Sequence, residues 1–187
     1  MKSEKAYNLL WISPTWKDRA GQQRTFQPMR DSVIENIRDI AIKNTSSDVR
    51  LWIDSVRMDS RQRAWLTNTL EESIGRNLSI CDLRDIPHYR TEPLYQGEDH
   101  TDLREDNRKV STIWRQVDAA KVLISLQGKY GQSFYADLDI SNLVLDSAEV
   151  QRKLSERGLV LSGLKHNGEI YWENQLFGFN ERGRDFF

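Results

Sequence analysis

Several residue types and motifs are scarce or missing in this sequence, and each absence argues against a class of protein. The chain of 187 residues has one cysteine, Cys81, which excludes an intrachain disulfide and a cysteine-rich zinc site and fits a reducing compartment. No apolar run approaches the roughly 20 residues of a membrane-spanning helix. Residues 1–7 are polar and lack the apolar core of a signal peptide. We therefore expect a cytoplasmic protein, or one that is secreted without an N-terminal signal.

Charge and motif content exclude further classes. The net charge of −1 gives no electrostatic reason to expect nucleic acid or an anionic membrane as a partner. The sequence contains neither a Walker-type phosphate loop nor the Gly-x-Ser-x-Gly elbow of serine hydrolases. Its histidines lack the spacing of metal ligands, and we expect all three in surface loops: His88, His100 and His166.

What the sequence does contain is a globular composition with alternating strand and helix patterns. Hydrophobic residues make up 38% and charged residues 29%, which predicts one folded domain over residues 1–187. Short continuous apolar runs, typical of strands in a parallel sheet, occupy residues 8–13, 49–54 and 78–83. This rhythm predicts an α/β fold with a mainly parallel central sheet flanked by helices.

The segments between these strands carry helical patterns. Apolar residues at helical spacing predict a helix over residues 28–43 and another from Ser60, a possible cap, to about residue 74, ended by Gly75. The second helix should turn four apolar side chains inward: Ala64, Trp65, Leu66 and Leu70. The polar residues 84–107 predict a long loop.

The second half of the chain continues the pattern. The strongest helix is predicted over residues 109–126, before a break at residues 128–131, and a shorter one over residues 147–157. Residues 166–168 are a hairpin-turn signal between strands at residues 159–162 and 169–172, which predicts a small C-terminal hairpin.

The stretch with the clearest chemistry is residues 134–140, Phe-Tyr-Ala-Asp-Leu-Asp-Ile. We expect a buried strand that ends in two carboxylates. On a strand, Asp137 and Asp139 would point to the same side, where they repel each other unless water or a cation lies between them. Carboxylate oxygens suit Mg²⁺ and Mn²⁺, which in turn bind phosphates.

The preceding helix makes a family resemblance specific. Residues 115–121 are Arg-Gln-Val-Asp-Ala-Ala-Lys, glycines follow at 128 and 131, and residues 135–139 are Tyr-Ala-Asp-Leu-Asp. Together they resemble the sugar-binding region of DXD-motif glycosyltransferases of the GT-A fold, which include the glucosylating toxins. The likeness covers roughly residues 8–180.

The chain also departs from the family pattern. Val117 stands where the family usually has Ser, and Lys121 where Arg is common. The glycine segment is about three residues longer, and family members usually carry a longer C-terminal region that binds the acceptor. The domain is therefore expected to lack part of that region.

The resemblance implies metal-dependent transfer of a sugar from a nucleotide-diphosphate sugar to an unknown protein or glycan. A hexose as the sugar and a UDP-sugar as the donor are the first expectations. Asp139 would coordinate Mn²⁺ or Mg²⁺ directly, Asp137 would reach the ribose or the metal through water, and Asn174 would complete the metal or donor site. A bound metal would stabilise the leaving diphosphate as its charge develops. The other implied donor-binding residues would contact the base, sugar or phosphates: Trp11, Trp52, Asp118, Lys121 and Tyr135.

Each of these assignments has a structural alternative. Asp137 and Asp139 could be surface acids at a strand end, and Asp118 and Lys121 could form a helix-surface pair. The two tryptophans could belong to the core, and Asn174 could cap a turn. Asp-Leu-Asp-Ile-Ser also resembles the nucleophile motif of haloacid dehalogenase-like phosphatases, although that fold places the motif on its first strand. A third possibility is a catalytically weak or inert nucleotide-sugar- or protein-binding module, which the short C-terminal region and the longer glycine segment would suit.

Overall fold

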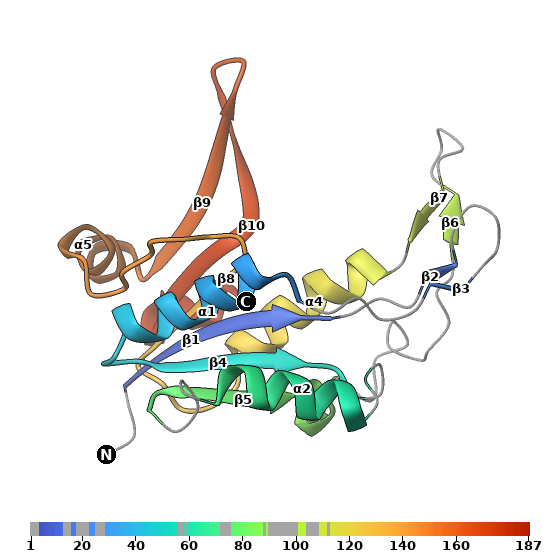
Figure 1. The fold of residues 1–187 in the computed structure, drawn as a ribbon. Helices are drawn as coiled ribbons and strands as arrows, with labels where there is room; N and C mark the ends of the chain where they lie inside the picture. Colours follow the sequence, from blue (N-terminus) through green and yellow to red (C-terminus); the bar gives the residue numbers. More distant parts are fainter. Residues whose placement is uncertain are drawn as a thin grey trace.

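A six-stranded sheet forms the centre of the chain. The computed structural model describes residues 4–12, 16–17, 23–24, 29–55, 58, 60–71, 76–87, 89, 101–103, 109–111 and 113–187. The six strands, in chain order, are β1 (Lys5–Trp11), β4 (Asp48–Ile53), β5 (Leu78–Asp82), β8 (Gln132–Ala136), β9 (Leu159–His166) and β10 (Glu169–Asn180). Two short ribbons, β2 (Trp16–Lys17) with β3 (Gln23–Arg24) and β6 (Thr101–Leu103) with β7 (Lys109–Ser111), lie on the side toward which β1 and β4 point (Figure 1).

The sheet is mixed, with a parallel majority. Its order is β5-β4-β1-β8-β10-β9, and the first four strands run parallel. β10 runs antiparallel to both of its neighbours. Along the chain, β4 and β5 are therefore added on one side of β1, and β8 is later added on its other side. The predicted α/β class and mainly parallel sheet are confirmed.

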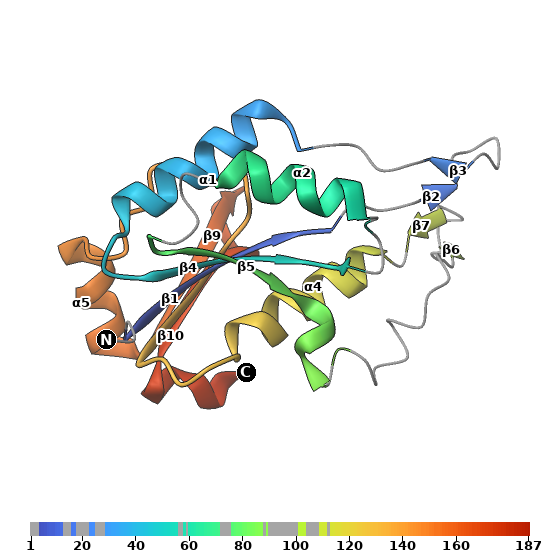
Figure 2. The same ribbon diagram turned by 60° about the horizontal axis from the view of Figure 1, so that its bottom comes forward.

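Helices cover both faces of the sheet. Figure 2 shows α1 (Asp31–Lys43) and α2 (Ser60–Leu70) on one face and α4 (Ile113–Ser125) on the other. Because side chains alternate along β1, Tyr7 and Leu9 join the α1–α2 core, while Leu10 packs with Ala120 and Ile124 of α4. Two cores on opposite faces explain why these strands are apolar without interruption.

The remaining helices and the hairpin also follow the sequence. α5 (Ala148–Arg157) begins at Ser147, whose hydroxyl accepts the Val150 N–H, and ends at Gly158 with a left-handed φ of 77°. The strands β9 and β10 meet at Asn167 and Gly168, with φ angles of 51° and 84° that suit a tight hairpin turn. Short 3-10 segments follow β5 and β10, at Leu83–Asp85 and Glu181–Phe186.

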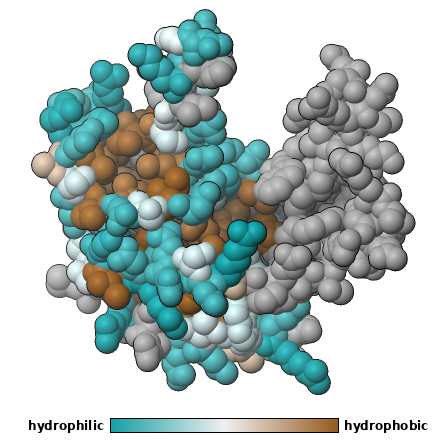
Figure 3. All heavy atoms as spheres, turned by 45° about the horizontal axis from the view of Figure 1, so that its top comes forward, coloured by the Kyte–Doolittle hydropathy of each residue, from teal (hydrophilic) through white to brown (hydrophobic). Residues whose placement is uncertain are grey.

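The hairpin is longer than predicted, because β10 runs without a break to Asn180. Its outer part projects from the body (Figure 1) and exposes Ile170 and Tyr171. Figure 3 shows the face that carries the hairpin, where apolar side chains appear in patches between hydrophilic ones.

Three expectations were wrong in detail. Residues 109–111 form β7, so the strong helix begins at Ile113 rather than at residue 109. Ala64 is exposed on α2, although Leu66 and Leu70 are buried. β8 ends at Ala136, before the two carboxylates expected on it. The expectations for Gly75, His88, His100 and most of the loop at residues 84–107 lie outside the described residues. Within the described part of the chain, no helix has the length and apolar character needed to cross a membrane.

Candidate functional site

The candidate site lies at the carboxyl end of β8, which pairs with β1 up to Tyr135 opposite Asn8. β1 lies between β4, the next strand of this sheet in the chain, and β8, a later one. The strand order therefore reverses between β1 and β8, at their carboxyl ends. In open α/β sheets, ligands bind at such a switch point. Asp137 directly follows β8 at this edge, and its backbone N–H donates to the Gln175 carbonyl of β10 at 2.7 Å.

A tight turn carries two of the three predicted metal ligands, Asp137 and Asp139. The Ile140 N–H donates to the Asp137 carbonyl at 3.0 Å, and Asn36 of α1 donates from Nδ2 to the carbonyls of Leu138 and Ile140 at 2.7 and 3.0 Å. Because Asp137 and Asp139 lie on this turn, the alternation that would place them on one side of a strand does not apply.

The two carboxylates consequently contact different surroundings. Asp137 faces Lys121 of α4, whereas Asp139 lines a hollow of about 500 Å³ on the α1 side. The hollow is also lined by Arg30, Glu35 and Asp39.

Lys121 is the centre of the polar cluster on the α4 side. Its Nζ lies 3.0 Å from Asp137 Oδ1, 3.3 Å from Asn174 Oδ1 and 3.8 Å from Asp118 Oδ1. Asn174 also donates from Nδ2 to Asp118 Oδ1 at 2.7 Å. The Lys121 side chain is only 7% exposed, against 26% for Asp137 and 55% for Asp118. The ammonium is therefore the buried end of the cluster, and the acids form its accessible side.

Asn174 reaches this cluster because β10 is irregular there. The pairing of β10 with β9 shifts register between Glu173 and Phe177, a bulge that re-aims the intervening side chains. The sequence predicted Asn174 to follow a short strand, whereas it lies inside a long one.

Tyr135 fixes the orientation of Asp137. Its hydroxyl donates to Asp137 Oδ1 at 2.5 Å, and its ring stacks on Phe177 at 5.3 Å between centroids. Burial raises the pKa of the Tyr135 hydroxyl far above its ordinary value, and the charges of Asp137, Asp118 and Asp139 raise it further. Tyr135 is therefore a permanent hydrogen-bond donor, and all three carboxylates act on the same hydroxyl.

The two predicted tryptophans occupy different environments. Trp52 is 4% exposed and belongs to the α4-side core, where Nε1 donates to Asn8 Oδ1 at 3.1 Å. The Arg50 guanidinium lies 4.3 Å from its ring. Trp11 is half-buried against the α1-side core at the end of β1. Trp52 thus lies in the core, as the structural alternative expected, whereas Trp11 is partly exposed on the α1 side. A contact of either side chain with a donor stays a prediction.

A buried hydrogen-bond network, which the sequence did not suggest, lies in the sheet next to the site. Asn8 donates to Ser133 Oγ at 3.2 Å and to the Phe134 carbonyl at 2.9 Å, and Ser133 donates to the Ser125 carbonyl at 2.6 Å. This network links β1, β4, β8 and α4 at one level of the sheet. In the sequence, the only sign of this network was the presence of two polar residues, Asn8 and Ser133, within otherwise apolar strands.

A second missed group lies at the ends of β4 and β5. Asp54, 2% exposed, accepts two hydrogen bonds from Arg84 at 2.9 and 3.2 Å and one from the Tyr89 hydroxyl at 2.7 Å. An acid directly after a parallel strand was visible in the sequence. Its partners come from the polar segment after β5, for which no local pattern existed.

The donor set is chemically suited to a hard cation. Among the residues that the structure describes, no three or more His, Cys, Asp or Glu side chains gather closely enough to hold a metal by themselves. Mg²⁺ in nucleotide sites, however, is held by one or two carboxylates together with the substrate's phosphates and waters. Asp137 and Asn174 supply oxygens of that kind, and both accept from Lys121 Nζ in this structure, whereas Asp139 faces the α1-side hollow.

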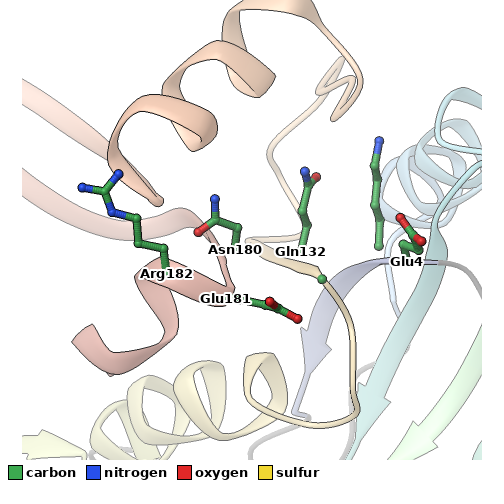
Figure 4. A pocket seen from close by; sticks show the side chains of 7 residues that line it. Glu4, Gln132, Asn180, Glu181 and Arg182 are labelled. Atoms are coloured by element: carbon green, nitrogen blue, oxygen red, sulfur yellow. The ribbon is translucent and has the colours of Figure 1, made fainter.

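Another hollow, of about 430 Å³, lies at the amino ends of β1 and β8. Figure 4 shows its polar lining, including Gln132, Asn180 and Arg182. Gln132 exchanges hydrogen bonds with Gln151, and Asn180 caps the following 3-10 turn through Gly183. These polar groups are engaged in holding the fold, at the opposite edge from the cluster around Lys121.

Comparisons with known proteins bear on the fold. No protein-family model and no curated protein matches the sequence. A solved structure described as a transferase superposes with a TM-score of 0.54 and 15% identity, over 96% of this chain and 74% of that chain. This similarity supports the fold alone.

Two glycosyltransferase structures match more distantly. The PaToxG glycosyltransferase gives a TM-score of 0.46 with 18% identity, over 73% of this chain and 42% of that chain. The bifunctional glycosyltransferase WbbM gives 0.47 with 11% identity, over 99% of this chain and 33% of that chain. This chain thus spans less than half the length of either glycosyltransferase chain, and no argument rests on these two scores.

Proposed function

We propose that this protein transfers a sugar from a nucleotide-diphosphate sugar, most simply a UDP-sugar, to an acceptor, with Mn²⁺ or Mg²⁺ bound beside the diphosphate. The observation that carries the proposal is the convergence of Asp118, Lys121, Tyr135, Asp137 and Asn174 at the carboxyl edge of the parallel sheet. These residues come from three segments of the chain, α4, the end of β8 and β10, and the family resemblance implicates each of them.

The arrangement supports distinct roles for the chain's own residues. Lys121 supplies a positive charge for the sugar–phosphate linkage, and the exposed Asp118 carboxylate accepts hydrogen bonds from sugar hydroxyls. Tyr135 holds Asp137 in one orientation. Asp137, Asp139 and Asn174 would hold the cation, which supplies charge stabilisation for the leaving diphosphate.

The competing phosphatase hypothesis has less support. It requires Asp137 as a nucleophile on the first strand of the sheet, whereas Asp137 follows β8 and is paired with the buried ammonium of Lys121. A binding module without turnover uses the same donor site and is separated from the enzyme by activity alone.

Turnover tests the proposal. The protein is incubated with UDP-glucose, UDP-galactose, UDP-N-acetylglucosamine and the corresponding GDP-sugars in Mn²⁺, and release of the free nucleoside diphosphate is measured. The proposal expects metal-dependent release from one donor, abolished in Asp137→Asn and retained in Asp146→Asn, whose carboxylate pairs with Lys5 away from the site. Binding of a donor without release would support the binding module, and neither binding nor release would refute both.

A further inference from the structure

The inner strand of the C-terminal hairpin has a free edge beside the candidate site. β10 pairs with β8 over residues 176–180, and the next contact outward is the Asp137 N–H with the Gln175 carbonyl. β8 then gives way to the turn at Asp137, whereas β10 extends outward over residues 169–174. Among the residues that the structure describes, this outer part of β10 has β9 as its one strand neighbour. Figure 1 shows it projecting beyond the helices.

The pairing register shows which backbone groups the free edge presents. Because residues 167–168 form a two-residue turn, the pair that closes it, His166 with Glu169, is a hydrogen-bonded one. The pairs alternate from there, so Ile170 and Trp172 belong to non-hydrogen-bonded pairs. Their backbone N–H and carbonyl groups therefore point away from β9, along the edge that β8 leaves open. Such a row of backbone groups is a template for a further strand.

The side chains along this edge favour a basic partner. Glu169, Tyr171 and Glu173 are two residues apart, so they share one face of the hairpin. Tyr171 is 49% exposed, and its hydroxyl donates to Glu169 at 2.8 Å. Asp118, 55% exposed, lies at the foot of the edge, where it accepts from Asn174 at 2.7 Å. An added strand with Lys or Arg at alternate positions places its cations between these carboxylates and against the Tyr171 ring.

We propose that the edge formed by residues 169–173 binds an extended, basic segment of an acceptor protein as an added β-strand, and that a hydroxyl side chain of this segment receives the sugar. The inference rests on the proposed function and names its acceptor class. Strand addition, in which backbone hydrogen bonds provide the affinity, leads the segment to Asp137 and Asn174 at the foot of the edge. The outer edge of β9 is the poorer alternative, because β10 separates it from the cluster around Lys121.

The transfer itself balances without a further reactant. The acceptor oxygen forms a bond to the anomeric carbon of the sugar, and the bond from that carbon to the diphosphate breaks. The electron pair of the broken bond leaves with the diphosphate, which takes up the hydroxyl proton.

The test measures binding of fluorescein-labelled peptides of roughly eight residues, enough to span the edge, by fluorescence anisotropy. Each peptide has one serine or threonine, with lysine or arginine at alternate positions and valine elsewhere, and a second set has glutamate in place of the basic residues. Ile170→Pro removes an N–H from the free edge. Lys165→Pro is the matched control, because Lys165 is the partner of Ile170 and its N–H points to the opposite edge of the hairpin.

The wild type should bind at least one basic peptide and transfer a sugar to it, and it should bind the acidic set at least about tenfold more weakly. Loss of a backbone hydrogen bond at the edge should weaken binding about tenfold in Ile170→Pro, whereas Lys165→Pro should stay within about twofold of the wild type. N-methylation of one alternating set of peptide residues should abolish binding, and N-methylation of the other set should not. Circular dichroism verifies folding. If Ile170→Pro does not fold, Glu169→Gln combined with Glu173→Gln tests the same edge and should weaken basic peptides about tenfold.

Four results would overturn the inference. In the first, no peptide binds although a donor is cleaved, and in the second, Lys165→Pro loses as much affinity as Ile170→Pro. The third is transfer to simple oligosaccharides that Ile170→Pro leaves unchanged, which would identify a glycan acceptor. The fourth is self-association of the wild type that Ile170→Pro abolishes, because a second copy would then occupy the edge. The proposed function fails separately, if no nucleotide sugar is bound or cleaved whether or not the peptides bind.

Discussion

The hydrogen bond from Tyr135 to Asp137 can be removed to test whether Tyr135 contributes to ligand binding or only to stability. Tyr135→Phe removes one oxygen and leaves the ring stacked on Phe177. A hydrogen bond to a charged group contributes about 1.5–3 kcal/mol, and the partial exposure of Asp137 places the loss near the lower value. For a domain of this size, about 1.5 kcal/mol lowers the melting temperature by roughly 3–6 °C.

The effect on ligand binding should be larger than the effect on folding. Without the hydroxyl, Asp137 keeps Lys121 as a partner but loses the hydrogen bond from Tyr135 that orients its carboxylate. Residues that orient a metal ligand typically contribute about 10–100-fold to metal affinity. We expect Mn²⁺ in the presence of UDP to bind at least about tenfold more weakly to Tyr135→Phe, measured by isothermal titration calorimetry at a temperature where the variant is folded.

Tyr130→Phe is the matched control. The Tyr130 hydroxyl donates to Asp48 Oδ2 at 3.0 Å, at the amino end of β4 and away from the site. This variant should lose stability but keep the wild-type affinity. The account of Tyr135 is refuted if Tyr135→Phe binds as the wild type does, or if Tyr130→Phe loses as much affinity.

Three further predictions concern buried hydroxyls and the second carboxylate. Among the described side chains, the buried Tyr7 hydroxyl has no hydrogen-bond partner, so Tyr7→Phe should leave the free energy of unfolding unchanged or raise it by up to about 1 kcal/mol in urea titrations. Burial raises the pKa of both Tyr7 and Tyr135, so the folded state favours their neutral forms. Unfolded tyrosine ionises near pH 10, so the stability that Tyr7 and Tyr135 contribute is complete below that pH and is lost as the pH rises above it. The free energy of unfolding should fall by about 2 kcal/mol between pH 10 and 11. In Tyr7→Phe it should fall by about half as much, because one of the two hydroxyls is absent. Asp139→Asn should weaken Mn²⁺ binding by at least about tenfold in the presence of UDP with little change in melting temperature, whereas unchanged binding would remove Asp139 from the metal site.

The central fold could be predicted because its determinants are local. Uninterrupted apolar runs in β1 and β4 and helical spacing in α1 indicated buried parallel strands with helices between them. The hairpin turn was equally visible, because Asn167 and Gly168 are residue types that tolerate positive φ.

The end of β8 was not predictable from local pattern, because distant residues set it. Leu138 and Ile140 continue the alternation of the strand, but their carbonyls accept hydrogen bonds from Asn36, about a hundred residues earlier. That contact stabilises a turn at Asp137 in place of two further strand residues. Because of this turn, Asp139 faces the α1-side hollow, whereas Asp137 pairs with Lys121.

The proximity of five predicted residues is confirmed, and their role in binding a donor stays a prediction. Family resemblance pointed to Asp118, Lys121, Tyr135, Asp137 and Asn174, which the structure brings together. It placed Trp52 in the site as well, although hydrophobicity alone explains the burial of that side chain.

Thermal melting against a panel of nucleotide sugars, with and without Mn²⁺, tests the central claim most directly, since a ligand that binds only the folded state raises the melting temperature. The account predicts that one donor raises the melting temperature only when Mn²⁺ is also present, and that the increase disappears in Asp137→Asn. No increase with any donor in Mn²⁺, or an increase that Asp137→Asn retains in full, would contradict the claim that this cluster is the donor site of a glycosyltransferase.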